Sequence, residues 1–243
     1  MLKVSIVIPA YNEEAFIGAL LEIILKIDLS PIGFEREIIV VDNGSEDKTF
    51  EIASAFPEVR CLRIEKNRGK GEGTKYGISQ ATGDYILIQD ADLEYDPQDY
   101  IPLLSPLREV DRPTAIYGSR IKGEERQGFF RGKHPEKSVA IWVANELLTF
   151  WVWLLFGKHI TDTLTGYKVY PSALLQKFTI ETKGFETDHE LTAKLIRSGV
   201  LIQEVPIRYY PRSVEEGKKI RAADFFIAIW TFLKYRFVTQ GKF

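Results

Sequence analysis

The chain begins with an apolar, mostly β-branched run that ends abruptly in polar residues, Val4-Ser5-Ile6-Val7-Ile8-Pro9-Ala10-Tyr11-Asn12-Glu13-Glu14. Such a run predicts a buried strand over residues 4–10, and the apolar spacing that follows predicts a helix over 13–27. The same pair recurs, with a strand expected over 37–42 and a helix over 47–56. This alternation of strands and helices predicts an α/β fold built on a mainly parallel, Rossmann-like sheet.

The alternation continues through the first half of the chain. We expect strands over residues 60–65, 85–90 and 115–118, with a helix over 75–81 between the first two. Helices should cover both faces of the sheet, and ligands of such sheets bind outside the carboxyl ends of the strands. Functional side chains are therefore expected at those ends.

The second half departs from this pattern. Residues 124–156 are interpreted as an inserted segment that faces the acceptor or a membrane, because a charged stretch without clear periodicity precedes an aromatic-rich helix from about residue 137. A helix over 187–198 and a strand over 201–209 follow. We expect one domain over residues 1–221 and a C-terminal amphipathic helix within 222–243.

Composition narrows the class of protein. The 243 residues carry 32 Lys and Arg against 34 Asp and Glu, so no whole-protein field attracts nucleic acid, and we expect no nucleic-acid partner. A single cysteine, Cys61, excludes an internal disulfide, and with three histidines it leaves no Cys/His set for zinc. The first apolar run is too short for the hydrophobic region of a secretion signal, so a cytoplasmic location is expected.

Two aromatic helices raise the question of membrane contact. Residues 139–156 approach spanning length, but Asn145 and Glu146 lie at the middle of this stretch, where a carboxylate is costly in hydrocarbon. Tryptophan with flanking cations favours a bilayer interface. We expect lipid contact for this helix. For the C-terminal helix, membrane contact and packing on the sheet or on a second subunit stay equally open, and we expect a peripheral protein on the cytoplasmic face of the membrane.

Three acidic residues follow the strand expected over 85–90. In an extended segment, Asp90, Asp92 and Glu94 would point to one side and could converge on a hard divalent cation, Mg2+ or Mn2+. A diphosphate would complete the coordination. The alternative, that acidic residues merely cap helices, is the better interpretation of Asp47 alone.

Three ordered motifs resemble the signatures of inverting family 2 glycosyltransferases with the GT-A fold. They are Pro9-Ala10-Tyr11-Asn12-Glu13-Glu14, Val41-Asp42-Asn43-Gly44-Ser45-Glu46-Asp47 and Gln89-Asp90-Ala91-Asp92-Leu93-Glu94. Farther along, Tyr117-Gly118-Ser119-Arg120, Asp162-Thr163-Leu164-Thr165-Gly166-Tyr167-Lys168 and Tyr210-Pro211-Arg212-Ser213 resemble the dolichol-phosphate mannose synthase branch and its bacterial polyprenyl-phosphate relatives.

The resemblance implies a role for each matching residue. The donor nucleoside diphosphate sugar, GDP-mannose or UDP-glucose, would be held by Pro9, Ala10, Tyr11, Glu13, Asp42, Asp90, Ala91, Asp92, Arg212 and Lys218. Asp92 and Arg212 would be the catalytic groups, with the metal bound by Asp90, Asp92 and Glu94. Glu94 stands where these synthases often have glutamine, which leaves the identity of the sugar open.

The resemblance also implies an acceptor. Arg120 and Arg131 would bind the phosphate of a polyprenyl phosphate, such as dolichyl or undecaprenyl phosphate, because guanidinium groups match phosphate oxygens. A phosphate monoester is already largely dianionic at neutral pH, so no strong general base is required. The same-class alternative is transfer to a sugar hydroxyl in polysaccharide or glycan synthesis, for which His189 is the obvious base and Asp188 a further site candidate.

Other interpretations fit less well. A dinucleotide-dependent oxidoreductase needs glycines after the first strand, where this chain has Tyr11 and Glu13. The Gly-rich run over 67–73 lacks the spacing of a phosphate-binding P-loop and is interpreted as a tight strand-to-helix turn near the donor site. A binding module that has lost catalysis is the third class, and the intact pair Asp90 and Asp92 argues against it.

Overall fold

The structure is a computed structural model that describes residues 1–127, 139–211 and 222–238. Its centre is a seven-stranded sheet in the order β3-β2-β1-β4-β6-β5-β7. The strands are β1 (Leu2–Ala10), β2 (Phe34–Asn43), β3 (Val59–Ile64), β4 (Tyr85–Ile88), β5 (Thr114–Ser119), β6 (Lys168–Pro171) and β7 (Leu201–Pro206). All pair in parallel except β6, which is antiparallel to both neighbours. The predicted α/β fold with a mainly parallel sheet is confirmed.

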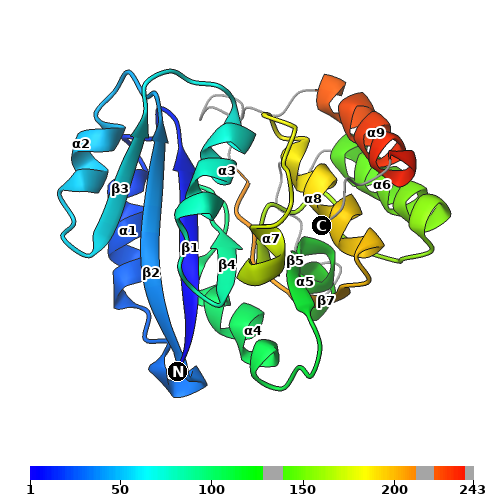
Figure 1. The fold of residues 1–243 in the computed structure, drawn as a ribbon, viewed down its shortest axis with the longest axis horizontal. Helices are drawn as coiled ribbons and strands as arrows, with labels where there is room; N and C mark the ends of the chain where they lie inside the picture. Colours follow the sequence, from blue (N-terminus) through cyan, green and yellow to red (C-terminus); the bar gives the residue numbers. More distant parts are fainter. Residues whose placement is uncertain (128–138, 212–221, 239–243) are drawn as a thin grey trace.

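Helices flank this sheet, as Figure 1 shows. The α-helices are α1 (Ile17–Lys26), α2 (Thr49–Ser54), α3 (Lys70–Gln80), α4 (Tyr100–Leu104), α5 (Arg120–Gln127), α6 (Val139–Phe156), α7 (Ser172–Leu175), α8 (Thr187–Arg197) and α9 (Ala222–Phe237). Short 3-10 turns cover Ser30–Ile32, Pro97–Asp99 and Ser105–Arg108. Most of the predicted helices and strands begin and end within a few residues of the predicted bounds.

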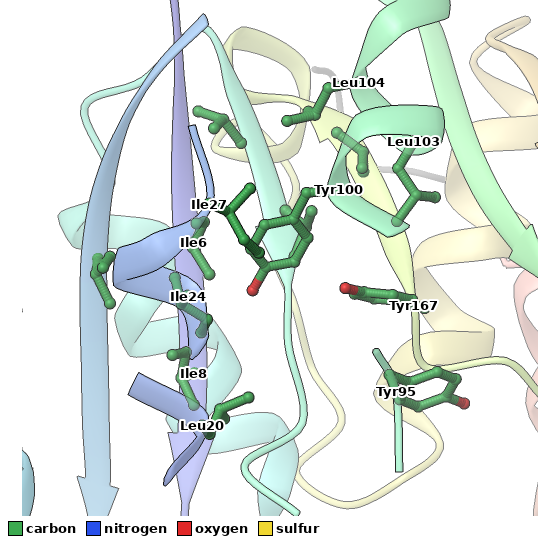
Figure 2. Packing of buried hydrophobic residues seen from close by; sticks show 14 of the residues in the cluster. Ile6, Ile8, Leu20, Ile24, Ile27, Tyr95, Tyr100, Leu103, Leu104 and Tyr167 are labelled. Carbon is green, nitrogen blue, oxygen red and sulfur yellow. The ribbon is translucent and has the colours of Figure 1, made fainter. Parts of the chain in front are cut away.

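Two apolar cores lie on opposite faces of the sheet because neighbouring residues of a strand point to opposite sides. In β1, Ile6 and Ile8 point into one core with α1 and α4, whereas Val7 points into the other. Figure 2 shows the first core, in which Tyr100 and Tyr167 pack among aliphatic side chains. Each face therefore buries an apolar layer, as the sequence predicts.

Three local expectations are wrong. The sequence predicts no strand at β6, which is short and begins with a lysine, yet Lys168 is fully buried there. The stretch from residue 120, part of which is expected to lack regular structure, forms α5. Residues 90–94 are not extended: they form a turn in which Leu93 has a left-handed backbone, with φ of 59°.

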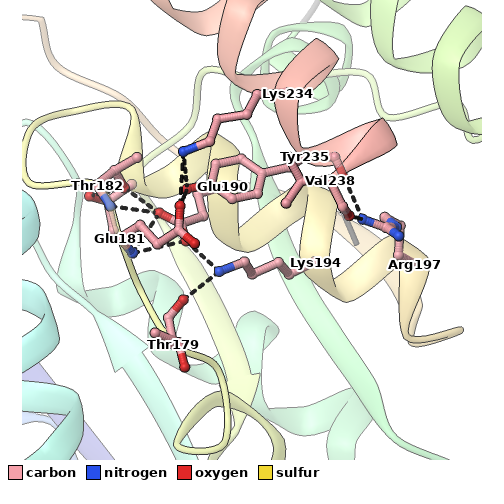
Figure 3. Close-up of polar contacts among 10 residues, drawn as sticks. Thr179, Glu181, Thr182, Glu190, Lys194, Arg197, Lys234, Tyr235 and Val238 are labelled. Atoms are coloured by element: carbon pink, nitrogen blue, oxygen red, sulfur yellow. Dashed lines mark hydrogen bonds and ion pairs between the residues drawn. The ribbon is translucent and has the colours of Figure 1, made fainter. Parts of the chain in front are cut away.

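Helix α9 packs on α6 and α8 (Figure 1) and contributes buried side chains, among them Phe232 and Tyr235, to the second core. Figure 3 shows polar contacts at the same place: Lys234 Nζ and the Tyr235 hydroxyl both lie within 3 Å of Glu181 Oε2. Arg197 donates to the carbonyl oxygens of Tyr235 and Val238. One face of the C-terminal helix is thus built into the fold.

Candidate active site

The motif residues converge on one edge of the sheet, the edge away from the N-terminus in Figure 1. Ala10 is the last residue of β1, Asp42 is the next-to-last residue of β2, Asp90 follows β4 and Arg120 follows β5. Because β6 is antiparallel, the segment before it, 162–167, also lies at this edge. The carboxyl edge of the sheet therefore carries the acidic and basic residues that the motifs single out.

Hydrogen bonds join the loop after β1, which carries Asn12 and Glu13, to the loop after β2, which carries Ser45 and Glu46. The amide of Asn12 donates to Ser45 Oγ at 3.0 Å, and the amide of Glu46 donates to Asn12 Oδ1 at 2.9 Å. The amide of Glu13 donates to Thr49 Oγ1 at 2.8 Å. The two motifs thus form one surface, with Pro9 and Tyr11 half-buried and the Glu13 side chain buried.

Asp42 is a fully buried carboxylate beside this surface. Its Oδ1 accepts a hydrogen bond from the amide of Ser45 at 3.2 Å. Its Oδ2 lies 3.3 Å from Arg63 Nε but makes no hydrogen bond to the described residues. The charge of this buried carboxylate is therefore balanced by the partly exposed Arg63 guanidinium beside it.

Lys70 at the start of α3 connects the two acidic residues nearest the centre of the site. Its Nζ lies 2.5 Å from Asp90 Oδ1 and 3.7 Å from Asp188 Oδ2. Burial would lower the pKa of this amine, but the charges of Asp90 and Asp188 outweigh that effect and hold the pKa above its ordinary value. Lys70 is therefore a permanent cation at the acidic cluster.

The Gly-rich run before α3 forms the predicted strand-to-helix turn. Gly69 has φ of 96°, a conformation that residues with a side chain rarely adopt, and it immediately precedes Lys70. The turn places Lys70 next to Asp90, a contact that the sequence did not predict. The sequence feature that could have indicated this contact is a lysine at the first position of the helix, directly after the glycine that makes the turn.

A turn at Leu93 divides the three expected metal ligands, with Asp90 and Asp92 before it and Glu94 after it. Glu94 is buried, and its Oε2 accepts a hydrogen bond from the Tyr209 hydroxyl. The turn at Leu93 redirects the chain between Asp92 and Glu94. Among the described residues no three His, Cys, Asp or Glu side chains gather as a metal site. The extended arrangement of residues 90–94 is therefore wrong, whereas metal binding by Asp90, Asp92 and Glu94 stays a prediction.

The segment before β6 closes against Asp90. A Cβ atom on Gly166 would lie 2.8 Å from Asp90 Oδ2, so a side chain at this position would displace the carboxylate from its present place. The amide of Gly166 donates to the Tyr95 hydroxyl at 2.9 Å. The motif around Asp90 and the motif around Gly166 therefore form a single packed unit.

Arg120 makes a two-pronged ion pair with Asp162. Nε and Nη2 each lie 2.7 Å from a carboxylate oxygen, and the guanidinium lies over the Tyr209 ring at 4.9 Å. Burial raises the pKa of Asp162, but the Arg120 charge outweighs that and holds the pKa below its ordinary value. Asp162, which the sequence analysis leaves without a role, thus orients the predicted acceptor residue.

The side chains at the start of α8 that could act as general bases are buried or paired with lysines. His189 is buried against the Phe232 ring, and burial together with the charges of Lys168 and Lys70 lowers the pKa of the imidazole to about 3. Glu190 is fully buried and accepts hydrogen bonds from Thr182 and Lys194. Asp188 shares Lys70 with Asp90.

Three of the predicted site residues, Arg131, Arg212 and Lys218, lie outside the described residues. Their roles stay predictions. Of the predicted residues that are described, Pro9, Ala10, Tyr11, Glu13, Asp42, Asp90, Ala91, Asp92, Glu94 and Arg120 all lie at or beside the carboxyl edge of the sheet.

The fold and these motifs define a nucleotide-sugar transferase of the GT-A type. The chain belongs to glycosyl transferase family 2, whose family model matches residues 5–177.

Relatives of assigned function share much of the chain. It is 31% identical over 212 residues to the low-salt glycan biosynthesis hexosyltransferase Agl6 of Haloferax volcanii, a match that covers 87% of this chain and 48% of Agl6. The chain thus spans about half of that relative. It is 25% identical to the dolichyl-phosphate beta-glucosyltransferase of Saccharomyces cerevisiae, covering 90% of this chain and 70% of that protein.

Solved structures agree with the fold. Glucosyl-3-phosphoglycerate synthase from Mycobacterium tuberculosis, in complex with Mn2+, UDP and phosphoglyceric acid, superposes with a TM-score of 0.70 at 22% identity, covering 98% of this chain and 80% of that one. Mannosyl-3-phosphoglycerate synthase from Rubrobacter xylanophilus also gives 0.70 at 18% identity, covering 96% and 72%. At these identities the likeness shows the GT-A fold alone.

Proposed function

We propose that the protein transfers glucose from UDP-glucose to a polyprenyl phosphate, with inversion at the anomeric carbon. The family and the edge of the sheet support a nucleoside diphosphate sugar as donor. Glucose, rather than mannose, is favoured because two relatives are named dolichyl-phosphate beta-glucosyltransferases. UDP is favoured because a structural neighbour was solved with UDP and Mn2+.

We propose that Asp90 and Asp92 bind a divalent cation. Carboxylate oxygens suit Mg2+ and Mn2+, and two protein ligands suffice when diphosphate oxygens and waters supply the rest. The approach of Gly166 and the Lys70 ion pair fix Asp90. Once bound, the ion would offset the negative charge that the leaving diphosphate acquires. Lys70 would add a fixed positive charge beside it.

The state of the candidate bases is the observation that carries the acceptor proposal. A sugar hydroxyl must lose a proton on attack and needs a base within hydrogen-bond reach. His189 is a weak base because burial and nearby lysines lower its pKa to about 3. Glu190 is bonded to Lys194, and Asp188 is paired with Lys70. A phosphate monoester brings its own negative charge to the anomeric carbon. These contacts therefore favour a phosphate acceptor, and Arg120 is its proposed partner.

The exposed faces of α6 and α9 support a lipid acceptor. Trp142, Phe150 and Trp153 of α6 are about half exposed, and Phe226 and Trp230 of α9 are 70% and 64% exposed. The two helices pack side by side (Figure 1). None of the described helices combines the length and hydropathy that crossing a bilayer requires. We propose peripheral contact with the cytoplasmic face of a membrane through these aromatic side chains.

A transfer assay tests this function. The protein with Mn2+ or Mg2+ is given radiolabelled UDP-glucose or GDP-mannose and a short-chain polyprenyl phosphate, and label is counted in the organic phase. Label from UDP-glucose in the lipid supports the proposal. Phosphoglycerate and a free sugar are the comparison acceptors. Transfer only to phosphoglycerate or only to a hydroxyl would end the polyprenyl-phosphate assignment.

One structural observation favours a second acceptor class, a sugar hydroxyl. Asp188 is 15% exposed at the site, and its distance of 3.7 Å from Lys70 is looser than the contact between Lys70 and Asp90. Under that function, Asp188→Asn would abolish transfer to the hydroxyl. Under the proposed function, it would leave transfer to a phosphate acceptor within about tenfold of wild type, because no proton need be removed.

A further inference from the structure

Tyr209 lies between the acidic motif after β4 and the predicted acceptor residue Arg120. Its hydroxyl donates to Glu94 Oε2, and the Arg120 guanidinium lies over its ring, with Cζ 4.9 Å from the ring centroid. Tyr209 is partly buried and follows β7, outside the residues that the sequence predicts for the site. One side chain therefore contacts both the acidic motif and the acceptor arginine.

The Tyr209 ring is held from several sides. The backbone of Tyr209 forms an antiparallel bridge with Tyr95, and the amide of Tyr210 donates to the carbonyl oxygen of Glu94 at 2.8 Å. The Tyr95 ring packs against the Tyr209 ring with 5.1 Å between the centroids. A hydroxyl that donates to a carboxylate makes one of the stronger hydrogen bonds in proteins, so Glu94 fixes the far end of the ring.

Two different contacts orient the Arg120 guanidinium. Asp162 accepts hydrogen bonds from Nε and Nη2 along one edge of the group, each at 2.7 Å. Because the guanidinium is planar, Nη1 faces away from this carboxylate. The ion pair alone would still let the group tilt about the carboxylate, and the attraction between the cation and the Tyr209 ring opposes that tilt. The Arg120 side chain is 16% exposed, so a ligand can reach part of it.

A guanidinium binds a phosphate through directed N–H groups, so its affinity depends on its orientation as well as on its charge. We propose that Tyr209 is a positioning residue that holds the Arg120 guanidinium in the orientation in which it binds the phosphate of the acceptor. This inference rests on the proposed polyprenyl-phosphate acceptor and adds a residue to its site. It also assigns a role to the Glu94 carboxylate, which anchors Tyr209 and, through the ring, Arg120.

Isothermal titration calorimetry of the full chain with geranyl phosphate tests this role. The titration is done at saturating UDP and Mg2+, so that the phosphate probe cannot enter an empty donor site. Tyr209→Leu should raise the Kd of geranyl phosphate about tenfold, because it removes the ring and the hydroxyl together. Tyr209→Phe keeps the ring and should raise the Kd about threefold or less. Tyr76→Leu replaces an exposed tyrosine on α3 and should bind as wild type does.

A double-mutant cycle tests whether Tyr209 acts through Arg120. Arg120→Gln, which keeps an N–H donor for Asp162, should raise the Kd of geranyl phosphate about 30-fold. Adding Tyr209→Leu to this variant should raise the Kd by less than about twofold further, because the group that Tyr209 positions is already gone. A further tenfold loss in the double variant would show that Tyr209 does not act through Arg120 and would overturn the proposal.

Binding of UDP separates positioning from general damage to the site. The Kd of UDP at saturating Mg2+ should change by less than about threefold in Tyr209→Leu, and melting temperatures confirm that each variant is folded. Should Tyr209→Leu fail to fold, Tyr209→Met, which fills more of the same space without a ring, takes its place. Equal weakening of UDP and geranyl phosphate would overturn the positioning role.

The same titrations distinguish this inference from the proposed function. If wild type and Tyr209→Leu bind geranyl phosphate equally well, the positioning role is wrong while the phosphate acceptor stands. If wild type binds UDP but no geranyl phosphate, the proposed acceptor fails, and the role of Tyr209 fails with it.

Discussion

Lys70 Nζ lies 2.5 Å from Asp90 Oδ1, so a lysine occupies one side of the carboxylate that is the first candidate metal ligand. The same ammonium group lies 3.7 Å from Asp188. A cation fixed by the fold and a cation bound from solution would therefore act on one acidic cluster, and their charges would repel each other.

This relationship predicts that Lys70→Met binds Mn2+ about tenfold more tightly than wild type in the absence of nucleotide. The reason is that a like charge a few ångströms away opposes metal binding even at an effective dielectric constant of about 20. Calorimetric titration with MnCl2 measures the change. Lys75→Met, an exposed residue on the same helix, should behave as wild type. Weaker metal binding in Lys70→Met would show that the lysine organises the ligands instead of competing with the metal.

Asp92→Asn should lower metal affinity and reduce turnover about 100-fold, because it removes a charged ligand that helps to stabilise the leaving diphosphate. Turnover is measured by release of UDP from UDP-glucose, and metal affinity by titration in the presence of UDP. Asp111→Asn replaces an exposed carboxylate outside the site and serves as the control. Full turnover in Asp92→Asn would show that Asp92 is not a metal ligand.

His189 makes folding stability depend on pH. Burial, with the charges of Lys168 and Lys70, lowers its pKa to about 3, whereas the unfolded chain has a value of about 6.5. The unfolded state therefore binds the proton first, and the stability present above pH 6.5 falls as the pH drops toward 3. Between pH 6.5 and 5 this group should remove about 1.6 kcal/mol of unfolding free energy. Urea denaturation at both pH values, compared with His189→Gln, isolates the contribution, which should be absent from the variant.

The C-terminal helix should contribute to the stability of the whole domain. Phe232 is fully buried between α9 and the second core, so Phe232→Ala should cost about 3–5 kcal/mol of unfolding free energy. Phe226 is on the same helix but 70% exposed, and Phe226→Ala should change stability by less than about 0.5 kcal/mol. Chemical denaturation of both variants decides the matter. Equal small effects would mean that α9 is an appendage to the fold.

The exposed aromatic side chains should mediate lipid binding. The double variant Trp153→Ser, Trp230→Ser removes one indole from α6 and one from α9, which are 49% and 64% exposed. It should reduce partition into anionic vesicles about tenfold. Flotation with liposomes measures the partition. Tyr76→Ser removes an exposed aromatic ring from α3 and should have no effect. If the double variant floats as wild type does but changes oligomeric state, these helices contact another subunit.

Local pattern was sufficient for the fold class and for much of the candidate site. The β-branched runs at β1 and β2 and the acidic motifs after β2 and β4 place Asp42, Asp90 and Asp92 at the carboxyl edge, because parallel strands must end on the same side. The two faces of β1 likewise follow from its period of two. These features depend on residues close together in the chain.

Tertiary packing decided the rest. Lys70 meets Asp90, and Asp162 meets Arg120, only because the sheet order brings α3, β4 and the antiparallel β6 together. Glu94 meets Tyr209, 115 positions away, because Leu93 turns the chain after Asp92. Spacing in the sequence carries no information on such pairs, since their distance is set by how elements remote in the chain pack on one another.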